Sequence, residues 1–578
     1  MNINPTPTLD PITFQVLWSR LQTIADEVAV TLEQTAFSNV VRDNHDYACG
    51  LYDADGAMLV QATTSTPGQL GSMARVVVDF LKTYPADTLR DGDVLITNDP
   101  WLGSGHTPDI YIATPMFYEG RLAGFTVNSA HHMDVGGRMA SPEAREVFEE
   151  GLIFPISKLY DAGEPNKTIF AMMRRNFRMA DKVIGDLRAQ VAANHVGVTR
   201  LSEMMHERKL TSLASLSMQI QDQTEASMRA SITEVPDGVY EHSLELEVDQ
   251  NDGSPIKLHC RIEIKGSDIS VDYAGTSAQV DRPINCVFNI TFAYTMFALK
   301  AALQPHVPNN AGCFRPINLS APEGSILNAT FPVAVWWRTD IVYYVTELIF
   351  GALAKIAPDR VMAASGTYPL WLSILSGKFD DGQPFLAHFN ASGGQGARSY
   401  MDGATTMVFP GNIANTPVEI LETDTPLLCE CKELIEDSGG VGQHRGGLGQ
   451  RVIIRNITER PVVSTVVGGR YKRGAAGSQS GGAGSTGRVQ IDDKPPAKAG
   501  REIQLMPNST LLLELPGGGG SGDPYSRDIS MVTADVREGI VSRASAESDY
   551  GVVLKADGTT VDSIATDRRR GTPSDRSR

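Results

Sequence analysis

The sequence lacks any pair of cysteines in C-x-x-C spacing, although it contains six cysteines: Cys49, Cys260, Cys286, Cys313, Cys429 and Cys431. Disulfide frameworks and structural zinc knuckles depend on such patterns, so neither is expected. Scattered thiols are typical of a reducing compartment. We therefore expect a cytoplasmic protein.

Positive charge is scarce as well. Fifty-one Lys and Arg residues stand against 68 Asp and Glu residues, which gives a net charge of -17 at pH 7. Such a chain repels the phosphates of nucleic acids and the surfaces of anionic bilayers, so neither is expected as a partner.

Long apolar runs are also missing. The most apolar segment, residues 341–357, is interrupted by Glu347 and Lys355, which predicts no bilayer-spanning helix. The first residues, MNINPTPTLDP, have neither the basic stretch nor the apolar core of a signal peptide. We expect no association with a membrane.

Two common catalytic signatures are absent. There is no G-x-x-x-x-G-K-[ST] loop for ATP and no G-x-S-x-G elbow of a serine hydrolase. Residues 482–487 do spell G-x-G-x-x-G, but residues 488–491 have the pattern of a strand where a dinucleotide-binding motif needs a helix. We interpret this segment as a loop.

The chain has 578 residues and 62.4 kDa, and 42% of its residues are hydrophobic, so it is long and apolar enough for more than one folded unit. We expect an α+β fold with large mixed sheets. The predicted regions are an N-terminal α/β region (1–165), a helical arm (166–229), a β-rich α+β domain (230–565) and a disordered basic tail (566–578).

Local patterns predict the elements of this fold. Helices are expected over residues 12–37, 69–84, 290–303 and 341–356, hairpins over 47–62 and 110–130, and strands over 93–97, 240–248, 256–264 and 269–273. About half of the 54 glycines fall between residues 390 and 525. That composition predicts a sheet-rich region with many turns of positive φ.

The most informative segment runs from residue 98 to residue 137, because three of only 11 histidines fall within it. His106 and Asp109 stand three residues apart at the entry of one predicted strand, and His131 ends the strand that returns. Counting from the turn at Glu119 and Gly120, position 109 lies within one residue of being opposite position 131. Two imidazoles and a carboxylate that converge in this way suit a divalent transition metal. A solvated histidine cluster with a capping aspartate is the other interpretation.

Three further residues are candidates near this cluster. Asp46 precedes the first predicted hairpin and is a possible fourth ligand, although RDNHDY is equally an ordinary polar turn. His132 and Asp134 are candidate catalytic residues, for proton transfer or for orienting the ligands. The alternative for Asp134 is a turn stabiliser before Gly136.

Nine segments, in order along nearly the whole chain, are similar to the hydantoinase B/oxoprolinase family. This family includes the B subunits of ATP-dependent hydantoinases and lactamases and the large subunits of acetone and acetophenone carboxylases. The segments are NDPWLGSGHTPD, HHMDVGG, EGLIFPISKL, VDYAGTS, PNNAGCFRPI, NTPVEILE, DSGGVGQHRGGLG, PGGGGSGDP and VREGIVS.

The resemblance implies that Asp46, His106, Asp109 and His131 bind a divalent metal, zinc or manganese. It also implies an A-type partner subunit that carries ATP and magnesium, in keeping with the missing phosphate loop. The expected function is that of the B-type metalloenzyme subunit of an ATP-dependent hydrolase that opens a hydantoin or lactam ring. A subunit of a ketone carboxylase is the alternative, and a non-catalytic scaffold for the A-type subunit is less favoured.

The sequence departs from the family in one place. Where many relatives have a small, glycine-rich stretch after a Phe/Tyr-Pro-x-Ala motif, this chain has Val335-Trp336-Trp337-Arg338. Two adjacent tryptophans would narrow or rebuild whatever this loop lines. The ring size and polarity of the substrate are therefore open.

Overall fold

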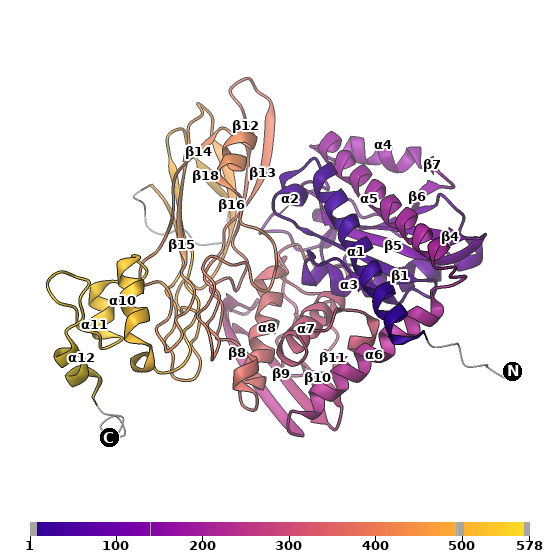
Figure 1. Ribbon diagram of the computed structural model, residues 1–578. Helices are drawn as coiled ribbons and strands as arrows, with labels where there is room; N and C mark the ends of the chain where they lie inside the picture. Colours follow the sequence, from indigo (N-terminus) through magenta and orange to yellow (C-terminus); the bar gives the residue numbers. More distant parts are fainter. Residues whose placement is uncertain (1–8, 139, 493, 495–501, 572–578) are drawn as a thin grey trace. The chain divides into compact units, whose positions relative to one another are not determined.

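A computed structural model describes residues 9–138, 140–492, 494 and 502–571 (Figure 1). The chain folds as two compact units. The first runs as far as Ala352 and includes Pro410–Ala414, and the second consists of Leu353–Phe409 and the chain from Asn415 onward. The boundary that the sequence predicts near residue 230 lies inside the first unit.

The first unit contains a seven-stranded sheet with the order β2-β1-β5-β4-β3-β6-β7, in which every neighbouring pair is antiparallel. The hairpins predicted over residues 47–62 and 110–130 are confirmed within it. The strands are β1 (Tyr47–Asp53), β2 (Met58–Gln61), β3 (Val94–Thr97), β4 (Asp109–Tyr118), β5 (Arg121–His131), β6 (Ser157–Asp161) and β7 (Glu164–Pro165).

Helices cover both faces of this sheet, and accordingly all seven residues of the inner strand β1 are buried, with successive side chains pointing to opposite faces. Cys49 and Leu51 of β1 lie in one core with α1 and α5, while Ala48 and Tyr52 lie in another with α3 (Figure 1). These helices are α1 (Pro11–Thr35), α3 (Pro67–Thr83) and α5 (Ala180–Glu207). Asp10 caps α1 by accepting from the N–H groups of Ile12 and Thr13.

The segment 166–229 is helical, as predicted, and it packs within the first unit. Helix α5 contacts α1 and the strands β4 and β5. Because the buried face of α5 lies against the sheet, this helix forms a layer of the first unit. The remaining helices of the unit are α2 (Asn39–Arg42), α4 (Lys167–Asn176), α6 (Ala214–Thr233), α7 (Phe288–Leu303) and α8 (Thr339–Leu353).

A second sheet of the first unit has four strands in the order β11-β10-β9-β8, and its only parallel pair is β10 with β11. Its strands are β8 (Gly238–Asp249), β9 (Pro255–Lys265), β10 (Asp268–Asp272) and β11 (Ile317–Ser320). The strands predicted from residue 240 to residue 273 are thus confirmed.

The second unit holds two antiparallel four-stranded sheets, with the orders β13-β12-β16-β18 and β14-β15-β19-β17. Their strands are β12 (Leu372–Lys378), β13 (Pro384–Asn390), β14 (Leu427–Leu434), β15 (Gln450–Asn456), β16 (Val462–Val467), β17 (Arg488–Ile491), β18 (Glu502–Leu505) and β19 (Thr510–Glu514). Its helices are α9 (Val418–Asp424), α10 (Ile529–Arg537), α11 (Arg543–Ser548) and α12 (Ser563–Arg570). The α+β class is confirmed.

Two predictions for the C-terminal part have definite outcomes. Residues 482–487 form a loop that leads into β17, as expected for a segment that is not a dinucleotide-binding motif. Residues 566–570 of the segment predicted to be disordered lie in helix α12, while residues 572–578 lie outside the described part. Among the described residues, no helix is long and apolar enough to span a bilayer.

The explanation by positive φ for the glycines between residues 390 and 525 is wrong. Of the described glycines in that range, only Gly522 has a positive φ. Most of the others allow extended chains to pack backbone against backbone: a Cβ on Gly394 would lie 1.8 Å from the carbonyl oxygen of Gly447, and one on Gly518 would lie 2.0 Å from that of Gln395. These chains hydrogen-bond to one another, for instance from Gly518 N to Gly447 O at 2.9 Å.

This packing makes Gly394→Ala strongly destabilising. The added methyl group would overlap a backbone carbonyl that cannot move alone, and we expect a loss of about 3 kcal/mol or more in the free energy of unfolding. Urea unfolding followed by circular dichroism measures it. Gly377→Ala is the control, since its Cβ would meet the movable Phe385 ring at 2.9 Å and should cost less. Equal losses for the two variants would contradict the account.

Candidate metal centre

The β4–β5 hairpin places the ends of its two strands side by side. Asp109 is the register partner of His131, although a bulge between Met116 and Phe117 shifts the pairing nearer the turn. The tight turn at Glu119 and Gly120 has positive φ at both residues. The convergence predicted from the sequence is therefore confirmed.

The loop from residue 99 to residue 108 brings His106 to the same end of β4 and β5. Asn98 fixes both ends of this loop, because its Nδ2 donates to Thr107 O at 2.7 Å and its Oδ1 accepts from Phe154 N at 2.6 Å. Gly105 has a φ of +84°, and a Cβ there would lie 2.9 Å from Cδ of Arg338. Only glycine combines this backbone conformation with so close a neighbour.

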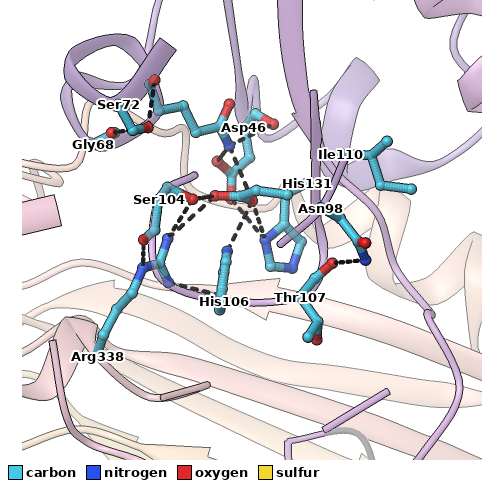
Figure 2. Close-up of polar contacts among 12 residues, drawn as sticks. Asp46, Gly68, Ser72, Asn98, Ser104, His106, Thr107, Ile110, His131 and Arg338 are labelled. Carbon is cyan, nitrogen blue, oxygen red and sulfur yellow. Dashed lines mark hydrogen bonds and ion pairs between the residues drawn. The ribbon is translucent and has the colours of Figure 1, made fainter. Parts of the chain in front are cut away.

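Three buried side chains with possible metal-ligand atoms converge at this end of the two strands (Figure 2). Suitable atoms of His106, Asp109 and His131 all lie within 4.8 Å of one another. Oδ1 of Asp109 lies 2.8 Å from Nε2 of His106 and 3.2 Å from Nδ1 of His131. His106 Nε2 is nonetheless buried without a hydrogen bond of acceptable geometry. Two imidazole nitrogens and one carboxylate oxygen in this arrangement fit a divalent transition metal.

Asp46 lies at the margin of the cluster. Its Oδ2 is 3.8 Å from Nδ1 of His131, and its backbone carbonyl accepts from the N–H of His131 at 3.0 Å. Gln69 of α3 links the two carboxylates: its Nε2 donates to Oδ1 of Asp46 at 2.9 Å and to Oδ1 of Asp109 at 3.3 Å. Asp46 thus lies beside the group of His106, Asp109 and His131 and is linked to it through Gln69 and His131.

Burial sets the charges in this cluster. It raises the pKa of Asp46 to about 6, and together with the cation of Arg338 it lowers the pKa of His106 to about 3. Burial also opposes ionisation of Asp109, but contacts with His106, His131 and Arg338 hold the pKa of this carboxyl well below its usual range. Asp109 is thus ionised beside a neutral His106, and these are the net charges that a carboxylate and an imidazole carry when they bind a metal.

Arg338 is the residue of this site that the sequence analysis did not identify. Its guanidinium lies 2.7 Å from Nδ1 of His106 and 3.2 Å from Oδ2 of Asp109, and its Nε donates to the carbonyl of Ser104 (Figure 2). Ser104 Oγ also donates to Oδ2 of Asp109. The available signal was the segment Trp336-Trp337-Arg338 itself, which the sequence analysis singled out as a departure from the expected family pattern.

Glu150 holds the loop that carries Arg338. Its buried carboxylate accepts from the N–H of Val335 at 2.9 Å and from the N–H of Trp336 at 2.8 Å. The Trp336 ring then lies 5.9 Å from the His106 ring, centre to centre, while Trp337 donates to the carbonyl of Ala140 at 3.2 Å. Only the first tryptophan therefore contacts the candidate site.

Glu150 should make stability depend on pH. Burial raises the pKa of its carboxyl from 4.5 to about 8, although two backbone N–H groups oppose this shift. The folded protein thus keeps a proton that the unfolded chain loses, so this stabilisation is complete below pH 4.5 and is lost as pH rises toward 8. In metal-free protein, the unfolding free energy of wild type minus that of Glu150→Gln should fall by about 1.4 kcal/mol per pH unit in this window. Urea titrations at several pH values measure it, and a constant difference would contradict it.

His132 and Asp134 lie outside the cluster. Nε2 of His132 contacts Oε1 of Gln190 at 2.9 Å, on the side of the sheet covered by α5. Asp134 accepts from the N–H groups of Gly136 at 2.9 Å and Met179 at 3.0 Å and pairs with Arg178. These contacts are those of a turn stabiliser, so the structure does not bring either residue to the candidate metal ligands.

Comparison with known proteins identifies the family of this chain. The family model described as hydantoinase B/oxoprolinase matches residues 10–524. An uncharacterized protein of Methanocaldococcus jannaschii is 34% identical over 97% of this chain and all of its own length. The caprolactamase subunit beta of Pseudomonas jessenii is 30% identical over 97% of this chain and 99% of its own.

Two solved structures share the fold. The crystal structure of the ATP-dependent caprolactamase from Pseudomonas jessenii matches 98% of this chain and all of its own matched chain, with a TM-score of 0.88 and 28% identity. A nucleotide-free acetone carboxylase matches 97% of this chain and 82% of its own, with a TM-score of 0.87 but only 19% identity, so it supports the fold alone. The chain belongs to the hydantoinase B/oxoprolinase family.

Proposed function

We propose that this chain is the metal-binding subunit of an ATP-dependent hydrolase that opens a cyclic amide, a lactam or a hydantoin. The observation that carries the proposal is the convergence of His106, Asp109 and His131 within 4.8 Å in a member of this family. A scaffold would have no need of three buried, ionisable side chains at one edge. The 30% identity to a caprolactamase subunit over almost the whole chain favours amide chemistry.

His106, Asp109 and His131 would hold the metal, zinc or manganese, with Asp46 as a fourth ligand. Such a metal supplies an acidified water and stabilises negative charge that develops on a carbonyl oxygen. Ser104 and Arg338 fix the carboxylate of Asp109 by bonding its outer oxygen, so that Oδ1 stays aimed at the two imidazoles. Gln69 does the same for Asp46.

A separate A-type subunit would bind ATP and magnesium. The sequence has no phosphate loop, and the related caprolactamase chain is by its name a beta subunit. In this division of labour the partner phosphorylates the amide oxygen of the substrate, and the present chain processes the activated carbonyl. Alone, the chain should not bind ATP appreciably, and calorimetry that found tight binding would contradict the division.

The reaction is tested with the complex reconstituted from this chain and its A-type partner. A panel of lactams, hydantoins and methyl ketones is incubated with ATP in water enriched in oxygen-18 and with carbon-13 bicarbonate. We expect ring opening that consumes ATP and places one solvent oxygen in the product acid. Labelled carbon in a β-keto acid, with no ring opening, would identify a ketone carboxylase. Absence of both reactions in an assembled complex would favour a scaffold.

A further inference from the structure

Arg338 touches the candidate metal ligands from their outer side. The atoms that face one another in the cluster are Nε2 of His106 and Oδ1 of Asp109, whereas Arg338 contacts Nδ1 of His106 and Oδ2 of Asp109. Figure 2 shows the guanidinium of Arg338 beside His106, on the side of the imidazole away from His131. The space between the ligand atoms is therefore left to the metal, while the orientation of the ligands depends on Arg338.

The contacts of Arg338 with Asp109 and with His106 differ in whether they leave the side chain able to bind a metal. A carboxylate has lone pairs on both oxygens, so Asp109 can accept from Arg338 through Oδ2 and still ligate a metal through Oδ1. A neutral imidazole has one nitrogen lone pair. A guanidinium only donates, so the 2.7 Å contact requires that the lone pair of His106 be on Nδ1 and that its proton be on Nε2.

To bind a metal, Nε2 of His106 must be unprotonated. The lone pair of the neutral ring must then be on Nε2 and the proton on Nδ1. Histidine ligands normally donate their second N–H to a carboxylate or a carbonyl, which leaves the metal-facing nitrogen unprotonated. Arg338 offers His106 no acceptor and adds a positive charge beside the site of a cation. The hydrogen bond from Arg338 and the coordination of a metal therefore exclude each other at His106.

We propose that Arg338 competes with the metal for His106, so that binding of the metal breaks the Arg338–His106 hydrogen bond while the Arg338–Asp109 ion pair persists. Arg338 is thereby a positioning residue that orients His106 and Asp109 in the metal-free cluster, and it sets how tightly the metal is held. The loop held by Glu150 and the close packing on Gly105 maintain the guanidinium within reach of both ligands.

The test is metal affinity, which does not depend on the partner subunit. The metal-free full chain is titrated with Zn²⁺ against a chelating dye. Arg338→Met should bind Zn²⁺ about 10-fold more tightly or better, because one lone pair is freed and one cation is removed. Arg315→Met removes the same charge from an exposed pair with Asp222 and Glu225 and should leave affinity unchanged. Equal or weaker binding by Arg338→Met would overturn the proposal.

A second measurement needs no variant. In a crystal structure of the wild-type chain with fully occupied metal, the Nη1–Nδ1 separation of Arg338 and His106 should exceed hydrogen-bonding distance, with the contact to Asp109 retained. A 2.7 Å contact that persists beside a metal bound at Nε2 would overturn the proposal.

Discussion

Replacement of His131 by alanine is expected to empty the metal site and leave the fold intact. His131 ends β5, and its side chain contacts Asp109 and Asp46 beyond the end of the strand, not in either apolar core. Loss of one of two imidazole ligands should weaken metal binding by roughly 100-fold or more. Elemental analysis after dialysis measures the metal, and circular dichroism checks the fold. His106→Ala should behave in the same way.

A histidine beside the site provides the matched control. His45 precedes Asp46 directly and is partly exposed beside Glu33. Its φ of 56° calls for a residue that tolerates the left-handed region, so His45→Asn is the suitable change. This variant should keep its metal. Full occupancy in a protein that lacks both His106 and His131 would remove the basis for the site.

Replacement of Asp109 by asparagine should reduce ring opening by the assembled complex by about 1,000-fold or more. The oxygens of Asp109 serve different neighbours, Oδ1 the two histidines and Oδ2 the donors Ser104 and Arg338. An amide has one oxygen only. In either orientation its NH₂ group opposes a donor or the metal, and the negative charge that balances Arg338 is lost.

Two variants separate this effect from a general loss of stability. Asp134 is as buried as Asp109 but caps a turn, so Asp134→Asn should lower the unfolding temperature and retain ring opening. His132→Ala should lose much less activity than Asp109→Asn. Steady-state rates per folded complex decide the comparison. Comparable losses in Asp134→Asn and Asp109→Asn would show that the cluster at Asp109 has no special part in the reaction.

The part of the site that could be predicted lies within one hairpin. A two-residue turn at Glu119 and Gly120 fixes which residues face each other, so the meeting of Asp109 and His131 follows from counting along two strands. The bulge near Met116 is the reason that the count was good only to one residue. Asp46 was a candidate from its position before the first hairpin and from a family motif, and the structure places it at the margin of the same cluster.

The part that could not be predicted comes from elsewhere in the chain. Arg338 and Glu150 reach the site through contacts across roughly two hundred residues of sequence. The local pattern of Glu150 does not differ from that of an ordinary turn, and the unusual segment Trp336-Trp337-Arg338 does not indicate which residues Arg338 contacts. Gln69 falls on a helix whose spacing predicts only a buried face. These contacts are determined by tertiary packing, which produces no periodic pattern in the sequence. The prediction of positive-φ turns for the glycines between residues 390 and 525 was wrong for a related reason. Composition does not distinguish a glycine in a turn from a glycine at a close approach of two backbones.

The central claim is that His106, Asp109 and His131 bind one divalent metal, and anomalous diffraction from a crystal of the metal-loaded chain tests it most directly. With data collected on both sides of the absorption edge of the metal, we predict one strong peak per chain, about 2.1 Å from Nε2 of His106, Oδ1 of Asp109 and Nδ1 of His131. A loaded crystal with no peak among these three atoms, or with its strong peak elsewhere, would contradict the account.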